Sequence, residues 1–85
     1  MATHTVTIKS MKFNPAILPV KAGDSVIWKN DDRAAHTATA DDGSVPDTGD
    51  IEGGKSSSPQ KFDAAGTVKY HCEYHGSMKG QVVVS

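Results

Sequence analysis

The chain has 85 residues, and its 9 Lys and Arg residues nearly balance its 10 Asp and Glu residues, which leaves a net charge of −1. This length suits one compact domain, residues 1–85, and leaves no room for a second domain. The single cysteine, Cys72, excludes an internal disulfide and any four-cysteine zinc or iron–sulfur site. The balanced charge argues against a nucleic-acid-binding protein that works through a broad basic face.

Charge is distributed unevenly along the chain. Residues 1–30 carry a net charge of +3, residues 31–52 carry −6 and residues 53–85 carry +2. We interpret the acidic stretch as a set of solvated turns, and a docking patch is the less favoured alternative. No apolar run approaches the roughly 20 residues of a membrane span. The first residues also lack the basic and apolar regions of a signal peptide, so the sequence predicts a soluble protein without a membrane span.

Apolar residues alternate with polar ones over short windows, and this period of two is typical of β-strands. The alternation nowhere holds a helical period beyond two turns, so the pattern predicts an all-β protein. In chain order, strands are predicted at residues 5–8, 17–20, 25–29, 36–39, 67–72 and 80–84.

Polar, glycine-rich and proline-rich segments mark the breaks between these strands. Asn30, Asp31 and Asp32 are predicted to form a turn in which side chains bond the backbone. Residues 44–54 predict an irregular excursion, and Pro59 predicts an edge strand directly after it, because proline cannot donate to a ladder. Seven or eight short strands at this spacing are typical of a Greek-key β-sandwich.

Cys72, His75 and Met78 place a thiol, an imidazole and a thioether within seven residues. Taken singly, a lone cysteine is most often a buried small residue, a methionine fills the core, and a surface histidine has no special role. Together they form a ligand set that suits copper, because Cu(I) prefers sulfur while nitrogen keeps Cu(II) accessible.

A copper site of this kind needs one more histidine. His36 is the natural candidate, because it begins a predicted strand after a turn, where a sandwich can bring it beside Cys72. Two histidines and one cysteine would form a trigonal plane, with Met78 as a weak axial ligand. His71 competes for the role, but side chains alternate along a strand, so His71 faces away if Cys72 faces the metal. His4 is expected to face solvent.

The chain resembles the small blue-copper proteins of the cupredoxin family in the run Tyr70-His71-Cys72-x-x-His75-x-x-Met78-x-Gly80-x-Val82-Val83-Val84, with Trp28-x-Asn30 and His36 upstream. The two-residue spacings on either side of His75 are similar to those of amicyanins rather than plastocyanins or pseudoazurins. The resemblance implies an eight-stranded sandwich with one type 1 copper at one end, held by His36, Cys72, His75 and Met78. It also implies a one-electron carrier that cycles between Cu(II) and Cu(I).

The family likeness carries further expectations about partners and place. The carrier would meet redox proteins, such as a dehydrogenase, a cytochrome or a reductase, through the surface around His75. We expect a monomer with no nucleic-acid partner, in the periplasm or otherwise outside the cytoplasm. We do not expect an enzyme, because four protein ligands leave no open metal position for a substrate.

The chain departs from the usual family pattern at three places, and one of them is Gly76-Ser77, which replaces the proline and aromatic pair often found between the histidine and methionine ligands. Thr37 stands where asparagine is frequent, and its hydroxyl can make the bond between the two ligand loops while its amide donates to the Cys72 sulfur. Tyr74 stands where proline is common, and we hypothesise that its amide donates a second hydrogen bond to the same sulfur.

Two alternatives to electron transfer remain open at the level of sequence. The same loop can hold zinc or Cu(I) in a structural or metal-handling role, because cysteine and histidine are also zinc ligands, although Met78 is a poor one. Alternatively, the fold is a binding module whose buried cysteine is inert and holds no metal.

Overall fold

The computed structural model describes residues 1–85, and all of its regular secondary structure is β-strand. The eight strands, in chain order, are β1 (Thr3–Lys9), β2 (Lys12–Asn14), β3 (Ile17–Val20), β4 (Asp24–Asn30), β5 (Thr39–Ala40), β6 (Gln60–Phe62), β7 (Gly66–His71) and β8 (Lys79–Val84). No segment forms a helix long and apolar enough to cross a lipid bilayer.

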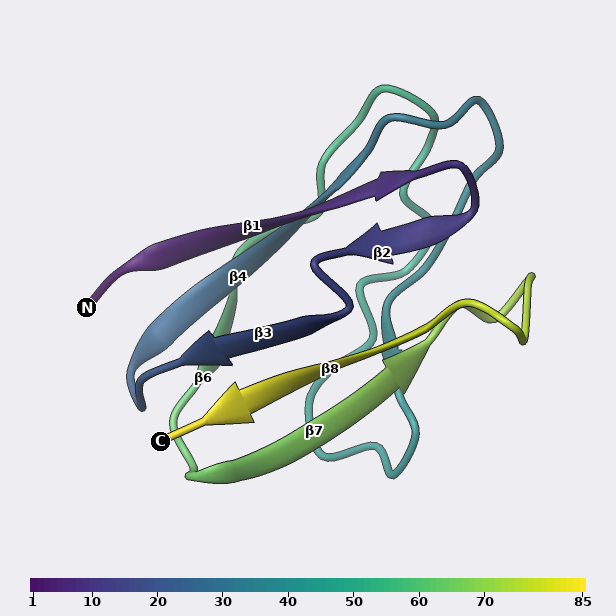
Figure 1. The fold of residues 1–85 in the computed structure, drawn as a ribbon. Coiled ribbons are helices and arrows are strands. Elements are labelled where there is room, and N and C mark those ends of the chain that lie inside the picture. Colours follow the sequence, from purple (N-terminus) through teal and green to yellow (C-terminus); the bar gives the residue numbers. More distant parts are fainter.

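The strands form two four-stranded sheets that pack face to face (Figure 1). One sheet has the order β2-β1-β4-β6 and the other has the order β3-β8-β7-β5. β1 pairs in parallel with β4, and β3 pairs in parallel with β8, while the other neighbours are antiparallel. The predicted all-β sandwich is confirmed, and β6 lies at a sheet edge directly after Pro59, as the proline indicated.

One cluster of buried apolar side chains fills the space between the sheets, because alternate residues of each strand point inward. Val6 and Ile8 of β1 face this space and are fully buried. Trp28 and Tyr70 meet there edge to face with ring centroids 5.3 Å apart. Cys72 and Met78 belong to the same cluster, so the connection between β7 and β8 is packed onto the core.

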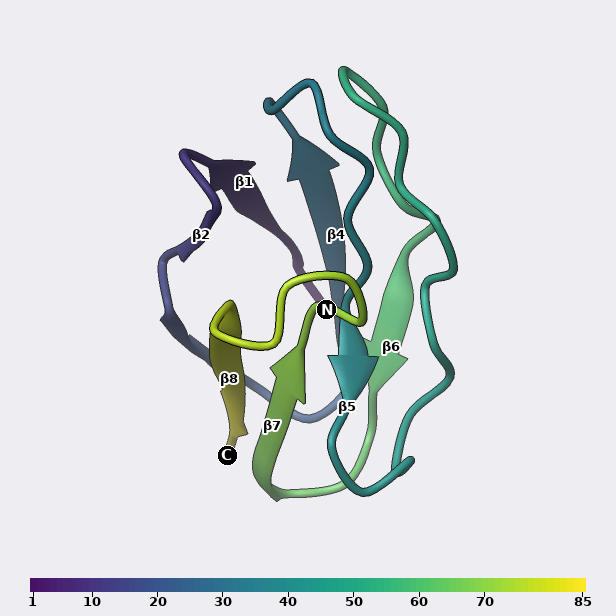
Figure 2. The same ribbon diagram turned by 90° about the vertical axis from the view of Figure 1, so that its right-hand side faces the viewer.

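Residues 72–78 connect β7 to β8 at the end of the sandwich opposite both chain termini (Figure 1). Figure 2 shows this connection crossing that end of the molecule. Two backbone hydrogen bonds close it into a compact loop: the Cys72 amide donates to the Met78 carbonyl at 3.1 Å, and the Met78 amide donates to the His75 carbonyl at 2.9 Å.

The strand predicted at residues 36–39 is wrong in its extent, because only Thr39 and Ala40 pair with β7. His36 instead exchanges both of its backbone hydrogen bonds with Ile51, at 2.7 and 3.1 Å. The next inward residue, Ala38, donates to the Thr48 hydroxyl at 2.9 Å. The irregular excursion predicted over residues 44–54 is present, and it provides the partners that a sheet neighbour would otherwise give to residues 36–38.

Candidate metal centre

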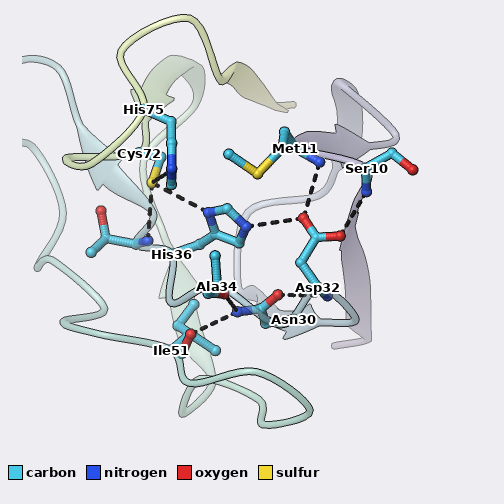
Figure 3. Close-up of polar contacts among 10 residues, drawn as sticks. Ser10, Met11, Asn30, Asp32, Ala34, His36, Ile51, Cys72 and His75 are labelled. Atoms are coloured by element: carbon cyan, nitrogen blue, oxygen red, sulfur yellow. Dashed lines mark hydrogen bonds and ion pairs between the residues drawn. The ribbon is translucent and has the colours of Figure 1, made fainter.

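Two histidines and the cysteine converge at the β7–β8 end of the sandwich. His36 Nδ1 and His75 Nδ1 each lie 3.7 Å from Cys72 Sγ, and the donor atoms of the three residues all lie within 4.8 Å of one another. His36 approaches from the segment before β5, whereas Cys72 and His75 belong to the β7–β8 loop (Figure 3). Figure 3 shows both imidazole rings directed at the sulfur.

The spacing of these atoms fits a bound metal ion. Metal bonds of about 2.0–2.1 Å to imidazole nitrogen and about 2.3 Å to thiolate sulfur place the two ligand atoms about 3.7 Å apart when the bond angle is near 120°. Cys72 and His36 are fully buried and Met78 is 3% exposed, while His75 is half-buried. A site with two nitrogens and one thiolate, on a loop that also carries the buried Met78, matches the preference of copper.

Thr37 joins the two halves of the site through both its backbone and its side chain. Its amide donates to Cys72 Sγ at 3.5 Å, and its hydroxyl accepts a hydrogen bond from the Glu73 amide at 2.9 Å. The structure therefore contains both contacts that the sequence analysis assigned to this threonine. A hydrogen bond to a ligating sulfur withdraws charge from it and so tunes the metal that it holds.

The hypothesis about Tyr74 is wrong in the structure. The hydrogen-bonding neighbours of Cys72 Sγ are the Thr37 amide and the two imidazoles, and the Tyr74 amide is not among them. Tyr74 instead makes its contact through the side chain, whose hydroxyl donates to the Asp50 carboxylate. This bond raises the pKa of Tyr74 and ties the exposed face of the loop to the 44–54 excursion.

The far side of the His36 ring contacts a carboxylate. His36 Nε2 lies 3.0 Å from Asp32 Oδ2, and the amides of Ser10 and Met11 donate to Asp32 at 2.8 and 3.0 Å (Figure 3). Burial of the Asp32 carboxylate opposes its ionisation, but the hydrogen bonds from Met11, Ser10 and His36 outweigh this cost and lower the pKa of Asp32. His36 is therefore held between the sulfur and an anionic oxygen.

Comparison with known proteins gives the family. The model of the cupredoxin-like domain matches residues 1–84 of the chain. The chain belongs to this family. It is 39% identical over 83 residues to amicyanin-alpha of Methylorubrum extorquens, covering 93% of the chain and 69% of that protein. It is 34% identical over 87 residues to plastocyanin of Scenedesmus fuscus, covering 88% of each.

Solved structures agree with this family assignment. A reduced Cu(I) form of an amicyanin variant at pH 4 superposes on this cupredoxin with a TM-score of 0.85 and 30% sequence identity, over 95% of the chain and 80% of that structure. A reduced amicyanin variant with a different substitution gives the same TM-score of 0.85 at 30% identity, over the same shares. The resemblance inferred from the Cys72, His75 and Met78 spacing is thereby confirmed.

Asn30 anchors the segment that carries His36 in this cupredoxin. Its fully buried side-chain amide donates to the carbonyls of Ala34 and Ile51 at 2.7 and 2.8 Å, and its side-chain oxygen accepts from the Asp32 amide at 2.9 Å. Asn30 and Asp32 were predicted to lie in a turn, and neither was predicted to have a role at the site. The signal in the sequence is their position between the apolar Trp28 and the candidate ligand His36, and Asn30 itself stands in the Trp28-x-Asn30 run that resembles the family.

The other two histidines of the cupredoxin lie away from the cluster. His71 Nδ1 lies 2.5 Å from Asp41 Oδ1, and this last residue of β7 is half-buried while the next residue, Cys72, is fully buried, as strand alternation predicted. His4 Nε2 lies 2.9 Å from Asp24 Oδ2 between β1 and β4, and this histidine is half-buried rather than fully solvent-facing. Neither belongs to the group of side chains that can hold a metal ion at the β7–β8 end.

Proposed function

We propose that this cupredoxin is a one-electron carrier in which His36, Cys72, His75 and Met78 hold a single type 1 copper. The observation that carries the proposal is the approach of two imidazole nitrogens to 3.7 Å from the buried sulfur of Cys72, one from His36, 36 residues earlier in the chain, and one from His75 in the same loop. Met78 is the fourth member because it is buried in the same loop, where its carbonyl accepts from the Cys72 amide. The copper, when bound, supplies a couple between Cu(II) and Cu(I).

The protein contributes rigidity to this proposed role. His36 is fixed by two backbone bonds to Ile51, and the Cys72 loop is fixed by the Thr37 hydroxyl and by its own two internal bonds. Ligands that do not move on a change of charge keep the rearrangement between the two oxidation states small. A small rearrangement favours fast electron transfer, and four protein ligands leave no position for a substrate, so we assign no catalytic step.

We propose that electrons pass to and from redox proteins through the surface around His75. This residue is half-buried at the end of the sandwich, beside the exposed Tyr74, Gly76 and Ser77. Contacts of this type are small, typically below about 1,200 Å², so we propose a monomer that forms transient complexes. The acidic stretch 31–52 favours a partner with a basic face and a salt-dependent association rate.

We propose further that residues 1–85 form one copper-binding domain and that it works outside the cytoplasm, in the periplasm or an equivalent compartment. The single hydrophobic cluster that includes Cys72 and Met78 supports the first statement. The proposed location outside the cytoplasm rests on membership of the cupredoxin-like family. Fractionation of the source cells, followed by immunodetection, tests it, and recovery of the protein from the cytoplasm alone would contradict it.

The visible spectrum of the Cu(II)-loaded protein tests the proposed function. The thiolate of Cys72 should give an intense band near ~600 nm, of the kind expected for a trigonal His₂Cys copper site. Cys72→Ser should remove the band, whereas His71→Ala, which alters a histidine outside the cluster, should retain it. Tight binding of zinc with no coloured Cu(II) form would favour a metal-handling role. A thiol that reacts equally fast with and without Cu(II) would favour an inert module.

A further inference from the structure

We infer that Asp32 is a positioning residue for the copper ligand His36, and that it joins this ligand to the turn between β1 and β2. The inference rests on the proposed function, because it concerns how the chain prepares one ligand of that site. Asp32 is not a ligand itself. Its carboxylate lies on the far side of the His36 ring from Cys72 (Figure 3).

The contact between Asp32 and His36 selects one form of the imidazole. A neutral imidazole carries a hydrogen on one nitrogen and a lone pair on the other. An ionised carboxylate only accepts hydrogen bonds, so the 3.0 Å contact requires the hydrogen on His36 Nε2. The lone pair then lies on Nδ1, which is the atom that faces Cys72 Sγ at 3.7 Å. Asp32 therefore leaves the nitrogen that faces the metal position free to bind.

The carboxylate is itself fixed by backbone groups from another part of the chain. The Ser10 amide donates to Asp32 Oδ1 at 2.8 Å, and the Met11 amide donates to Oδ2 at 3.0 Å. Ser10 and Met11 have φ angles of 54° and 59°, a left-handed conformation that residues other than glycine rarely adopt. The two bonds to Asp32 stabilise these two residues in the turn between β1 and β2.

The charge of Asp32 has a consequence for the metal. A carboxylate hydrogen-bonded to a ligating imidazole increases the basicity of the ring, and loss of such a partner typically weakens metal binding by about 10–100-fold. The Asp32 side chain is only 16% exposed, so solvent screens its charge incompletely. A more basic ligand favours Cu(II) over Cu(I). Each tenfold loss of Cu(II) affinity relative to Cu(I) raises the reduction potential by about 59 mV.

Asp31 offers a matched control for the loss of one negative charge. It is adjacent in the chain, it is exposed, and its carboxylate lies 3.5 Å from Lys29 Nζ. Asp31→Asn removes the same charge as Asp32→Asn but no contact with the His36 ring or with the Ser10 and Met11 amides. A difference between the two variants therefore measures the contacts of Asp32 rather than the total charge of the protein.

The experiment compares these two variants with the unchanged protein at neutral pH. Asp32→Asn should weaken Cu(II) binding about 10–100-fold in a competition titration and raise the reduction potential. It should also accelerate hydrogen exchange of the Ser10 and Met11 amides. Asp32→Glu, which keeps the charge, should shift the potential less than Asp32→Asn. Asp31→Asn should leave the affinity, the potential and the exchange rates unchanged.

The same affinity and potential in the Asn variants of Asp31 and Asp32 would overturn the inference. If Asp32→Asn does not fold, nitrogen NMR of the unchanged metal-free protein determines which nitrogen of the His36 ring carries the hydrogen. The expected result is a hydrogen on Nε2. A hydrogen on Nδ1 instead would refute the assignment. A wild-type protein that gives no coloured Cu(II) form would contradict the proposed function. The role of Asp32 would still be tested by the tautomer of His36 and by the exchange rates of the Ser10 and Met11 amides, because neither measurement needs copper.

Discussion

Replacing Asn30 by alanine should destabilise the metal-free protein by about 2–4 kcal/mol. The side chain of Asn30 is fully buried and makes three hydrogen bonds, two from its amide nitrogen to the carbonyls of Ala34 and Ile51 and one to its oxygen from the Asp32 amide. A typical bond of this type contributes about 0.5–1.5 kcal/mol, and the sum for three, about 1.5–4.5 kcal/mol, brackets the expected loss. The residues that Asn30 connects are those that position His36.

Thermal unfolding of the metal-free protein, followed by circular dichroism, provides the assay. A domain of this size loses about 4–8 °C in melting temperature for each kcal/mol, so Asn30→Ala should melt about 10–30 °C lower. Working on the metal-free form separates this effect from any change in copper affinity. A variant within about 0.5 kcal/mol of the unchanged protein would behave like an ordinary surface substitution and would refute the reasoning.

Asn30→Asp is a more specific test, because aspartate keeps the shape of the Asn30 side chain and the oxygen that accepts a hydrogen bond, while it removes both N–H donors. Its carboxylate would face the carbonyl oxygens of Ala34 and Ile51, and burial beside these oxygens should raise its pKa in the folded state. A raised folded pKa means that the folded state binds the proton more tightly, so the variant should recover stability as the pH falls. Destabilisation that does not change with pH would contradict the buried contact with these carbonyls.

Three further predictions concern other contacts. Thr37→Val should cost about 1–3 kcal/mol because the Glu73 amide loses its acceptor, while Thr37→Ser should cost less; equal melting temperatures for the two variants would exclude the hydroxyl contact. Hydrogen bonds from the Ala2 amide, the His4 ring and the Lys21 amide hold the pKa of Asp24 well below its ordinary value of 3.8. The ionised Asp24 carboxylate therefore stabilises the fold above pH 3.8, and this stabilisation is lost as the pH falls from 3.8 towards the lowered pKa. Asp24→Asn should therefore flatten the acid limb of unfolding followed by Trp28 fluorescence, and an unchanged limb would contradict this. Met78→Ala should retain copper with an altered spectrum and reduction potential, and complete loss of copper would show that Met78 is more than an axial ligand.

The sequence predicted the parts of the site that are local in the chain. Cys72, His75 and Met78 are separated by two residues each, so one loop suffices to bring them together and their spacing is visible in the sequence. His36 was predicted from its place after a turn and from the family likeness, and the structure brings it to the same sulfur. The alternation of side chains along β7 also predicted that His71 points away from Cys72.

The contacts that hold the site together could not be predicted in the same way. Asn30 and Asp32 have the composition of a solvated turn, yet one is fully buried and the other contacts His36 and the Ser10 and Met11 amides. Such contacts depend on segments about 20 residues away, and local propensity does not contain this information. The short strand β2 (Lys12–Asn14) was not predicted, because three residues are too few to show alternation.

Residues 36–38 show a further limit of pattern reading. Their alternation suggested a strand, and the backbone at His36 is indeed paired, but its partner is Ile51 in an irregular segment. The side chain of Thr48 replaces the next ladder bond, at Ala38. Hydrophobic alternation reports which side chains face inward, whereas the partner of each backbone group is decided by the tertiary fold.

A crystal structure of the copper-loaded protein would test the central claim most directly. The account predicts one copper ion bonded to Nδ1 of His36, Nδ1 of His75 and Sγ of Cys72, with the sulfur of Met78 at a longer distance. It also predicts that His36 Nε2 keeps its contact with Asp32. A copper ion bound elsewhere, for example at His71 and Asp41, with the sulfur of Cys72 unbound, would contradict the account.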